Sequence, residues 1–535
     1  MWRFLPFAVI LAGLALCLAG LSHSTWLALP ALLFAGLSII GLYDLLQTRH
    51  TIWRNFPVTG RIRWLGETLR PFLRAYIVES ETEGRPFNHE TRAMVYRRAK
   101  DVTSVEPFGS QVDMDRPPYE WLSHSMNACL PDTTDPRVTV GAPGTARPYS
   151  ASVFNISAMS FGSLGARAIE ALNRGAAEGG FYHDTGEGGV SKYHEAGGGD
   201  LVFELGSGYF GARARDGCFD PGMFRETAAR EQVKMIEIKL SQGAKPGHGG
   251  VLPGEKVTPE IAAARGIEVG QTCYSPASHS AFATPVELME FVARLRELSG
   301  GKPVGLKFCV GNRWEVLALM KASLKTGIRP DFMVIDGAEG GTGAAPVEFQ
   351  DHVGMPLRQG LVFARNALVG AGLKDEVRLA CAGKQLSAFQ LAASMALGAD
   401  WVNTARGFMF SLGCIQSLNC HNNTCPTGIA TTDAGRQRGL SVADKAARVA
   451  SFHRNTIRAL MEVVGAAGCA HPSELTARHI VHRVTEDIVE PAQRAYQLLE
   501  PGELIEAPDG THLACEWAMA QAESFVPAAI SGAPP

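Results

Sequence analysis

The pattern of apolar and polar positions divides the chain into an apolar N-terminus, an irregular connection and a long alternating region. Residues Phe4–Leu21 and Thr25–Tyr43 contain no charged side chain. Each run is close to the about 20 residues that a helix needs to cross a bilayer. Only Ser22-His23-Ser24 separates the two runs. The pattern therefore predicts a transmembrane helical hairpin over residues 1–48.

Arginines follow the second apolar run, at positions 49, 54, 61, 63, 70 and 74. By the positive-inside rule they place the rest of the chain in the cytoplasm, anchored at the inner or plasma membrane. A cleaved signal peptide over the first twenty or so residues is the alternative, and the second run disfavours it. The segment Arg61–Glu79 is expected to lie on the membrane surface or to form an ordinary amphipathic helix. Residues 49–150 are predicted to be membrane-proximal and then, from Asn88 to Arg147, an irregular wrap.

From Ser152 onward, short runs rich in β-branched residues alternate with helical patterns. Eight such strands within about 250 residues are typical of an α/β (β/α)8 TIM barrel, here over residues 151–440. A doubly wound open sheet is the alternative, weakened because no G-x-G-x-x-G follows the first strand. A C-terminal helical extension is predicted over residues 441–535. The expected strands are Val153–Met159, Gly180–His183, Leu201–Glu204, Met235–Leu240, Val304–Val310, Phe332–Asp336, Val377–Ala382 and Trp401–Thr404; the expected helices are Ala166–Glu178, Pro285–Leu298, Trp314–Lys325, Leu357–Val369, Ser387–Leu397 and a helical pattern from Val442 to about Leu499.

Composition narrows the class of protein. The 535 residues carry a net charge of −3, which gives no support to nucleic-acid binding. Eleven cysteines over this length are not a disulfide framework. The 58 glycines suit a large enzyme with many tight turns.

Three cysteines are concentrated between Gly413 and Thr431, with the spacing C-x5-C-x4-C: Cys414, Cys420 and Cys425. Three thiolates without a fourth nearby suit a three-iron cluster better than tetrahedral zinc. His421 would complete a zinc set, so zinc is an alternative. A disulfide is disfavoured because the number is odd and the predicted compartment is reducing.

In a barrel, the working residues follow the C-terminal ends of the strands. Gly383 and Arg406 stand at the last two strand ends, where barrels tend to bind phosphate. Lys307, on a middle strand, would place positive charge near a reduced flavin; its alternative is a salt-bridged side chain. The strand ends carry Ala158–Ser163, Asp184–Gly189, Gln242–Pro253, Lys307, Asp336–Gly343, Ala382–Lys384 and Ala405–Gly407.

Between about Asn155 and Asp433 the chain resembles the FMN-binding synthase domain of glutamate synthases. The resemblance lies in Met159–Ser163, Thr185–Gly189, Gln242–Gly247, Gly340–Ala344, and the cysteine loop ending in Cys425–Thr431. It implies FMN in the barrel mouth and a 3Fe–4S cluster on Cys414, Cys420 and Cys425. It also implies reductive amination of 2-oxoglutarate by ammonia to glutamate, with hydride from reduced FMN.

The resemblance also assigns site residues. Lys245, Glu187 and Lys307 are expected to be catalytic, and Lys245 and His248 to contact substrate. The residues expected to hold FMN are Ala158, Met159, Ser160, Glu187, Lys307, Gly340, Gly341, Thr342, Gly383, Ala405 and Arg406.

The chain departs from the family pattern in three respects. It begins with apolar segments in place of a glutaminase domain, so glutamine hydrolysis is not expected. No pyridine-nucleotide domain is visible, so an external donor is expected, either ferredoxin-like or a membrane carrier. His248 and Val251 stand where the family typically has Glu and Gln, and that Gln helps to hold the keto acid. Valine has no side-chain hydrogen-bonding group.

Three hypotheses follow. The first is a membrane-anchored oxidoreductase of glutamate synthase type with a small-molecule substrate. The second keeps FMN and the cluster but acts on another substrate in a pocket shaped by His248 and Val251. The third is a membrane-bound electron-transfer subunit. Self-association is left open by the sequence.

Overall fold

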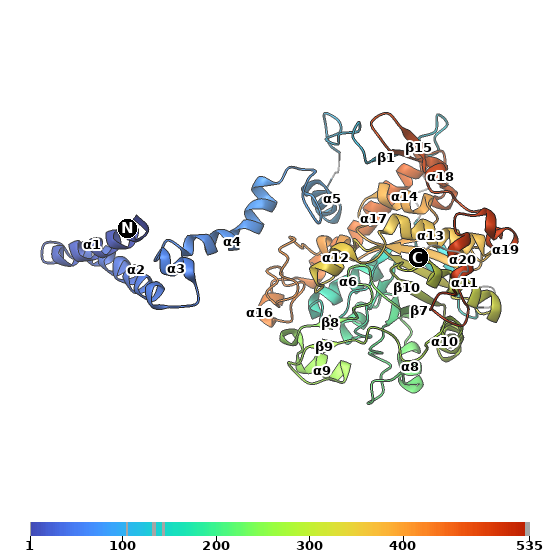
Figure 1. Cartoon of the computed structure of the whole chain (residues 1–535), viewed down its shortest axis with the longest axis horizontal. Coiled ribbons are helices and arrows are strands. Elements are labelled where there is room, and N and C mark those ends of the chain that lie inside the picture. The colour runs from blue at the N-terminus through green and yellow to red at the C-terminus, as the bar shows by residue number, and fades with distance from the viewer. Residues whose placement is uncertain (1, 103–104, 131–134, 142–144, 530–535) are drawn as a thin grey trace. The chain divides into compact units, whose positions relative to one another are not determined.

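The computed structural model describes residues 2–102, 105–130, 135–141 and 145–529, which form two compact units (Figure 1). The first unit is Met1–His89 and the second is Glu90–Pro535. Each unit has its own internal packing and is described separately.

The first unit contains two apolar helices, α1 (Leu5–Gly20) and α2 (Ala28–Leu46), which pack against each other. Including their first turns, they span Trp2–Gly20 and Thr25–Leu46 at a mean hydropathy of 2.0. Almost all of their side chains face outward. The predicted helical hairpin is therefore present and is long and apolar enough to cross a membrane, although a signal sequence shares these properties.

Beyond the hairpin, the first unit continues as α3 (Thr51–Asn55), α4 (Arg61–Leu73) and a π-helical turn (Arg74–Val78). Asp44, at the end of α2, is fully buried and pairs with Arg61 at 2.6 Å. The same carboxylate accepts a hydrogen bond from the Val58 amide at 3.0 Å. These bonds fix the start of α4 against the end of α2, and α4 itself buries none of its residues.

The second unit is built on a closed barrel of eight parallel strands, as predicted (Figure 1). Most of these strands are buried along their whole length, because the barrel interior covers one face and helices cover the other. Pairing of the last strand with the first closes the barrel. In order, the strands are β4 (Phe154–Ile156), β5 (His183–Asp184), β6 (Leu201–Leu205), β7 (Val233–Lys239), β10 (Val304–Phe308), β11 (Phe332–Asp336), β12 (Arg378–Ala382) and β13 (Trp401–Thr404).

Each strand is followed by a crossover helix. The long helix α17 packs on α6, where Gly175 allows close approach of Val449. An added Cβ at Gly175 would lie 2.5 Å from the Val449 side chain. The helices are α6 (Ala166–Gly179), α7 (Lys192–Glu195), α8 (Pro221–Ala228), α10 (Pro285–Leu298), α11 (Arg313–Thr326), α13 (Leu357–Gly370), α14 (Ala388–Ala396), α15 (Arg406–Ser411) and α17 (Val442–Ala466).

Two insertions enlarge the C-terminal end of the barrel. Between β7 and α10 lie the hairpin β8 (Val251–Leu252) and β9 (Cys273–Tyr274) and the helix α9 (Pro259–Arg265). Between β11 and α13 lies α12 (Val347–His352). Both follow strand ends, so they add walls to the barrel mouth.

The prediction of an all-helical stretch from Val442 to Leu499 is wrong in its second half. Helix α17 ends at Ala466, and the chain then forms β14 (Ile480–Arg483) and β15 (Val489–Pro491). The stretch Ile480–Thr485 is rich in β-branched residues, and a turn closed by Thr485 and Ile488 follows it. Because β-branched residues favour strands, this run and the turn after it favour a hairpin.

The expectation of an irregular wrap from Asn88 to Arg147 is also only partly right. This stretch contains α5 (His89–Ala99), β1 (Tyr119–Leu122) and β2 (Arg137–Val140). Strand β1 pairs with β14, and β2 pairs with β3 (Tyr149–Ser152). The wrap is thus anchored to the second unit through sheet hydrogen bonds. Residues 142–144 and other parts of this prediction lie outside the described residues.

Trp401 tests the barrel core. Its ring is fully buried, and its Nε1 donates to the Tyr182 hydroxyl at 2.8 Å. Trp401→Ala removes both, so we expect the free energy of unfolding to fall by about 3–5 kcal/mol. Tyr274→Ala, at a residue 70% exposed, is the control and should change it by no more than about 0.5 kcal/mol. Denaturant unfolding followed by near-UV circular dichroism measures both; equal losses would contradict this account of the core.

Candidate active site at the barrel mouth

The loops after the barrel strands line a cavity of about 110 Å³ that opens to solvent. Many of the predicted site residues line it together, although they are separated by up to 262 positions in the sequence, from Ala158 to Cys420. Those predicted residues are Ala158, Met159, Ser160, Glu187, Lys245, Gly341, Thr342, Ala405, Arg406 and the cysteine Cys420. The structure therefore brings together the first, second, fourth, sixth and eighth strand ends.

The centre of the cavity holds an ion pair between Lys239 and Glu187. Lys239 Nζ lies 2.7 Å from Glu187 Oε2 and 3.3 Å from the side-chain oxygen of Gln242. Burial would raise the pKa of Glu187, but the charge and hydrogen bond of Lys239 outweigh it and lower that pKa. Sequence reasoning missed Lys239. The same signal that marked Lys307, a lysine at the end of an apolar strand, was present in Met235–Leu240.

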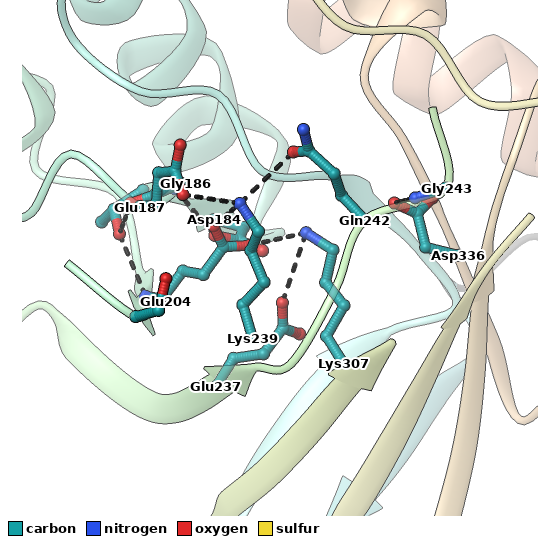
Figure 2. A network of polar contacts seen from close by, with 12 residues as sticks. Asp184, Gly186, Glu187, Glu204, Glu237, Lys239, Gln242, Gly243, Lys307 and Asp336 are labelled. Atoms are coloured by element: carbon teal, nitrogen blue, oxygen red, sulfur yellow. Dashed lines mark hydrogen bonds and ion pairs between the residues drawn. The ribbon is translucent and has the colours of Figure 1, made fainter. Parts of the chain in front are cut away.

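Lys307 lies deeper, inside the barrel, rather than on the cavity wall. Its Nζ is 2.5 Å from Glu204 and 3.6 Å from Glu237. Figure 2 shows Lys307 beside Lys239, with Glu204 close to both and Glu237 close to Lys307. Lys307 is thus salt-bridged, which was the alternative expected for it. It acts on the cavity only indirectly, through Glu204 and Lys239.

The acidic side of this network includes Asp184. One carboxylate oxygen from each of Asp184, Glu204 and Glu237 lies within 4.8 Å of the others. Burial and the charge of Glu204 raise the pKa of Asp184 to about 7. Burial and the charge of Asp184 raise the pKa of Glu237 well above its ordinary value. Three carboxylates around one lysine are unfavourable when all are charged, which favours the protonated form of Glu237.

The loop after β7 carries the predicted substrate residues. Lys245 is 2% exposed, and burial lowers its pKa to about 8. An added Cβ at Gly250 would lie 1.8 Å from the Glu187 carboxylate, so this loop presses directly onto Glu187. Val251 lines the cavity. His248 is not among the lining residues and packs edge-on against Phe349, with 5.0 Å between ring centres.

A second residue that the sequence did not single out is Arg265, at the end of α9. It lines the cavity and is 5% exposed. Its guanidinium donates to the Phe161 carbonyl at 3.3 Å and stacks over Phe210 at 4.9 Å. Arg265 also helps to lower the pKa of Glu187. It therefore adds positive charge to the wall that carries Lys245.

The opposite wall joins Arg406 to the glycine loop after β11. Arg406 Nη2 donates to the Thr342 carbonyl at 2.9 Å, and Nη1 lies 3.9 Å from Cys420 Sγ. A Cβ at Gly341 would lie 2.9 Å from Arg406 Nε, so a larger residue there would shift the guanidinium. Gly340 and Gly383 do not line the cavity, although Gly383 adopts a positive φ of 141° that favours glycine at the turn.

The cysteine loop lies next to this wall. The Cys425 thiol contacts the Thr427 hydroxyl at 3.3 Å. Burial would raise the pKa of Cys425, but that hydroxyl and the amides of the following residues lower it. The Tyr96 hydroxyl donates to the Cys414 carbonyl at 2.5 Å. Polar hydrogens around buried sulfur suit a thiolate ligand.

The spacing of the cysteines is wide. Among the described residues, only Asp184, Glu204 and Glu237 bring three metal-ligand atoms within 4.8 Å of one another. Sulfur ligands on one tetrahedral zinc lie about 3.8 Å apart, given zinc–sulfur bonds of about 2.3 Å. The sulfurs of Cys414, Cys420 and Cys425 are therefore not all as close to one another as ligands of a single zinc ion would be.

Comparison with known proteins gives a consistent result. The family model described as "Conserved region in glutamate synthase" matches residues 142–470. The glutamate synthase large subunit-like protein YerD of Bacillus subtilis (strain 168) is 36% identical over 501 residues, covering 85% of this chain and 94% of YerD. The archaeal-type glutamate synthase (NADPH) of Thermotoga maritima is 34% identical over 313 residues, 58% of each protein.

A solved structure of similar fold is that of mandelate oxidase with (S)-2-phenylpropionate. It has a TM-score of 0.38 and 17% identity, covering 73% of this chain and 98% of that chain. A likeness this distant supports no conclusion about function.

The Asp184 proton has a measurable consequence. In the folded chain its pKa rises from 3.8 to about 7, so the folded state holds this proton to higher pH than the unfolded chain. Ionisation of Asp184 then costs stability as the pH rises through that window. Asp184→Asn keeps an acceptor for the Gly186 amide and removes this cost.

We therefore expect the variant to gain stability relative to the unmodified chain between pH 4 and pH 7, with a constant difference above pH 7. Unfolding free energies measured across this range test it. Asp351→Asn, at an exposed carboxylate, is the control. A difference for Asp184→Asn that does not change with pH would show that the proton is not held there.

Proposed function

The chain belongs to the glutamate synthase family, a family of oxidoreductases, and from that premise we propose that its barrel mouth binds FMN and reduces an imine to an amine. The preferred reaction is reductive amination of 2-oxoglutarate, or a related keto acid, with ammonia. The observation that carries this proposal is the shared cavity. One space is lined by the Lys239–Glu187 ion pair, by the glycine and Arg406 wall, and by Cys420 of the cysteine loop.

The wall of small residues suits a flat ring with a phosphate tail. Ala158–Ser160 and Gly341 present backbone to the cavity, and Gly186 approaches the Ser160 amide closely enough that an added Cβ would lie 2.8 Å from it. Arg406 supplies the positive charge that a phosphate needs. FMN held there would supply hydride. Lys307 would influence it only through Lys239 and Glu204, because Lys307 is buried beneath them.

The chain's own residues then anchor the substrate and provide a proton. Lys245 and Arg265 offer positive charge to a substrate carboxylate from one wall. Reduction of an imine to an amine adds one hydride to the imine carbon and one proton to the nitrogen. The Lys239 ammonium is the proton donor we favour, because it reaches the cavity and Glu187 holds it in place at 2.7 Å. Glu204 lies 4.0 Å from the same ammonium and is itself paired with Lys307.

We propose that Cys414, Cys420 and Cys425 hold a 3Fe–4S cluster. Two observations support it: the polar hydrogens around Cys425 and the contact of Arg406 with Cys420. Zinc fits less well, because tetrahedral zinc takes four ligands. Since Cys420 and Arg406 line one cavity, electrons that enter at the cysteine loop have a short path to FMN.

A second candidate is the same chemistry on a different substrate. Val251 and Leu252 present an apolar surface beside Lys245, where 2-oxoglutarate would need a second polar partner. Arg265 is the nearest lining residue that would replace that partner. A keto acid with one carboxylate and an apolar side chain fits this wall as well.

The electron donor is proposed to be external, a ferredoxin-like protein or a membrane carrier. The two apolar helices of the first unit support a membrane anchor, and the arginines after them favour a cytoplasmic barrel. Under the same proposal, α4 lies on the membrane surface, because it exposes Ile62, Leu65 and other apolar residues together with arginines.

The cofactor proposal is tested by Cys420→Ser. We expect the purified variant to lose most of its iron and the electron paramagnetic resonance signal of an oxidised three-iron cluster, because two thiolates do not retain it. Flavin absorbance should remain, since Cys420 only borders the flavin space. Cys515→Ser, at an exposed cysteine, should leave iron and flavin unchanged. Zinc in place of iron in the unmodified protein would contradict the cluster.

The substrate is tested by turnover. Protein reduced with dithionite should be reoxidised by 2-oxoglutarate with ammonia, and glutamate should appear. Val251→Gln restores one hydrogen bond to a carboxylate, so we expect the KM for 2-oxoglutarate to fall about 10- to 100-fold. Val269→Gln, at a residue 59% exposed, serves as control. The second candidate would be favoured if, in the presence of ammonia, only an apolar keto acid reoxidised the protein and Val251→Gln gave the same result.

A further inference from the structure

Lys256 is a buried lysine that is not among the labelled residues of the network in Figure 2. It lies in the short 3-10 turn Gly254–Lys256 after β8 and is 2% exposed. Its Nζ donates to the Ser163 carbonyl at 2.9 Å. In the described part of the chain, no carboxylate lies within 4.0 Å of this ammonium. A buried cation costs several kcal/mol unless an anion compensates it, so its compensating charge lies elsewhere.

The groups whose charge favours this ammonium belong to the cysteine loop. Burial lowers the pKa of Lys256 to about 8, and Cys420 and Cys425 act in the opposite direction. The two segments are also joined directly, because Asn423 Nδ2 donates to the Glu255 carbonyl at 3.2 Å. The lysine is therefore held beside the loop by its own turn and by a loop residue.

The arrangement places cations on two sides of the cysteine loop. Arg406 approaches Cys420 at 3.9 Å but also binds the Thr342 carbonyl of the cavity wall. Lys256 binds the neutral Ser163 carbonyl and is shielded from solvent. Its charge is thus poorly screened and acts mainly on the sulfurs.

We propose that the Lys256 ammonium is a fixed positive charge that raises the reduction potential of the iron–sulfur group held by Cys414, Cys420 and Cys425. This inference rests on the proposed function, since it requires that group to be present. When a reductant such as dithionite supplies one electron, the negative charge beside Lys256 increases by one unit. The buried ammonium stabilises that added charge and exchanges neither an electron nor a proton. Lys256 is a positioning residue, not a catalytic one.

The test is a redox titration of the full-length protein at pH 7, with dithionite and mediators, followed by electron paramagnetic resonance. Two variants remove the charge: Lys256→Met, and Lys256→Gln, which retains a donor for the Ser163 carbonyl. Lys256→Arg retains the charge. We expect the Lys256→Met and Lys256→Gln proteins to contain as much iron as the unmodified protein. We expect their iron–sulfur group to be half reduced at a lower potential. We expect Arg to stay close to the unmodified value.

Lys302 provides a matched control. It is also buried, at 6% exposed, it also binds backbone carbonyls, and burial also lowers its pKa to about 8. The charges that act on it come from Arg147 and Lys234, not from cysteines. Lys302→Met therefore carries a similar cost in stability and should leave the reduction potential unchanged.

The outcomes separate this inference from the proposed function. If Lys256→Gln keeps its iron and its potential does not change, the inference is wrong while the cluster stands. If both neutral variants lose iron and Lys302→Met does not, Lys256 holds the loop in place and the proposed tuning role is overturned. If the unmodified protein itself shows no cluster signal, the cluster assignment fails first and this inference fails with it.

Discussion

The interaction on which the site depends is the ion pair between Lys307 and Glu204 inside the barrel. At 2.5 Å and almost without solvent, it places a positive charge where three carboxylates converge. Without that charge, Asp184, Glu204 and Glu237 would repel one another in a medium of low dielectric constant. With it, Glu204 remains available to Lys239, and Lys239 is presented to the cavity by Glu187. The barrel interior thus supports the mouth electrostatically as well as by packing.

The same cavity has two chemically different walls. One carries Arg406 and glycine-rich backbone and adjoins the cysteine loop, which suits a phosphate-bearing cofactor and its electron supply. The other carries Lys245 and Arg265 beside the apolar Val251, which suits a substrate with a carboxylate and limited polarity elsewhere. Val251, one of the two departures from the family pattern in the loop after β7, belongs to this second wall.

Much of this organisation was predictable from the sequence. The eight strands could be read because a closed parallel barrel buries both faces of each strand, which leaves unbroken apolar runs in the chain. Many strand-end residues could be assigned to one cavity because all parallel strands point the same way. The hairpin of β14 and β15 was missed although the β-branched residues of Ile480–Thr485 favour it. What the local pattern could not show is its pairing with β1, some 360 positions earlier.

The sequence by itself therefore determined the apolar N-terminal helices, the barrel and the set of residues at its mouth. Only the tertiary structure decided which of those residues form ion pairs and how deeply each is buried. In the structure, Lys307 lies in the barrel interior and not on the cavity wall. His248 packs against Phe349, and Lys239 is the lysine that reaches the cavity. The reason is physical: strand order and period state which residues meet at one end of a barrel, but depth and pairing depend on the distances between side chains from different strands.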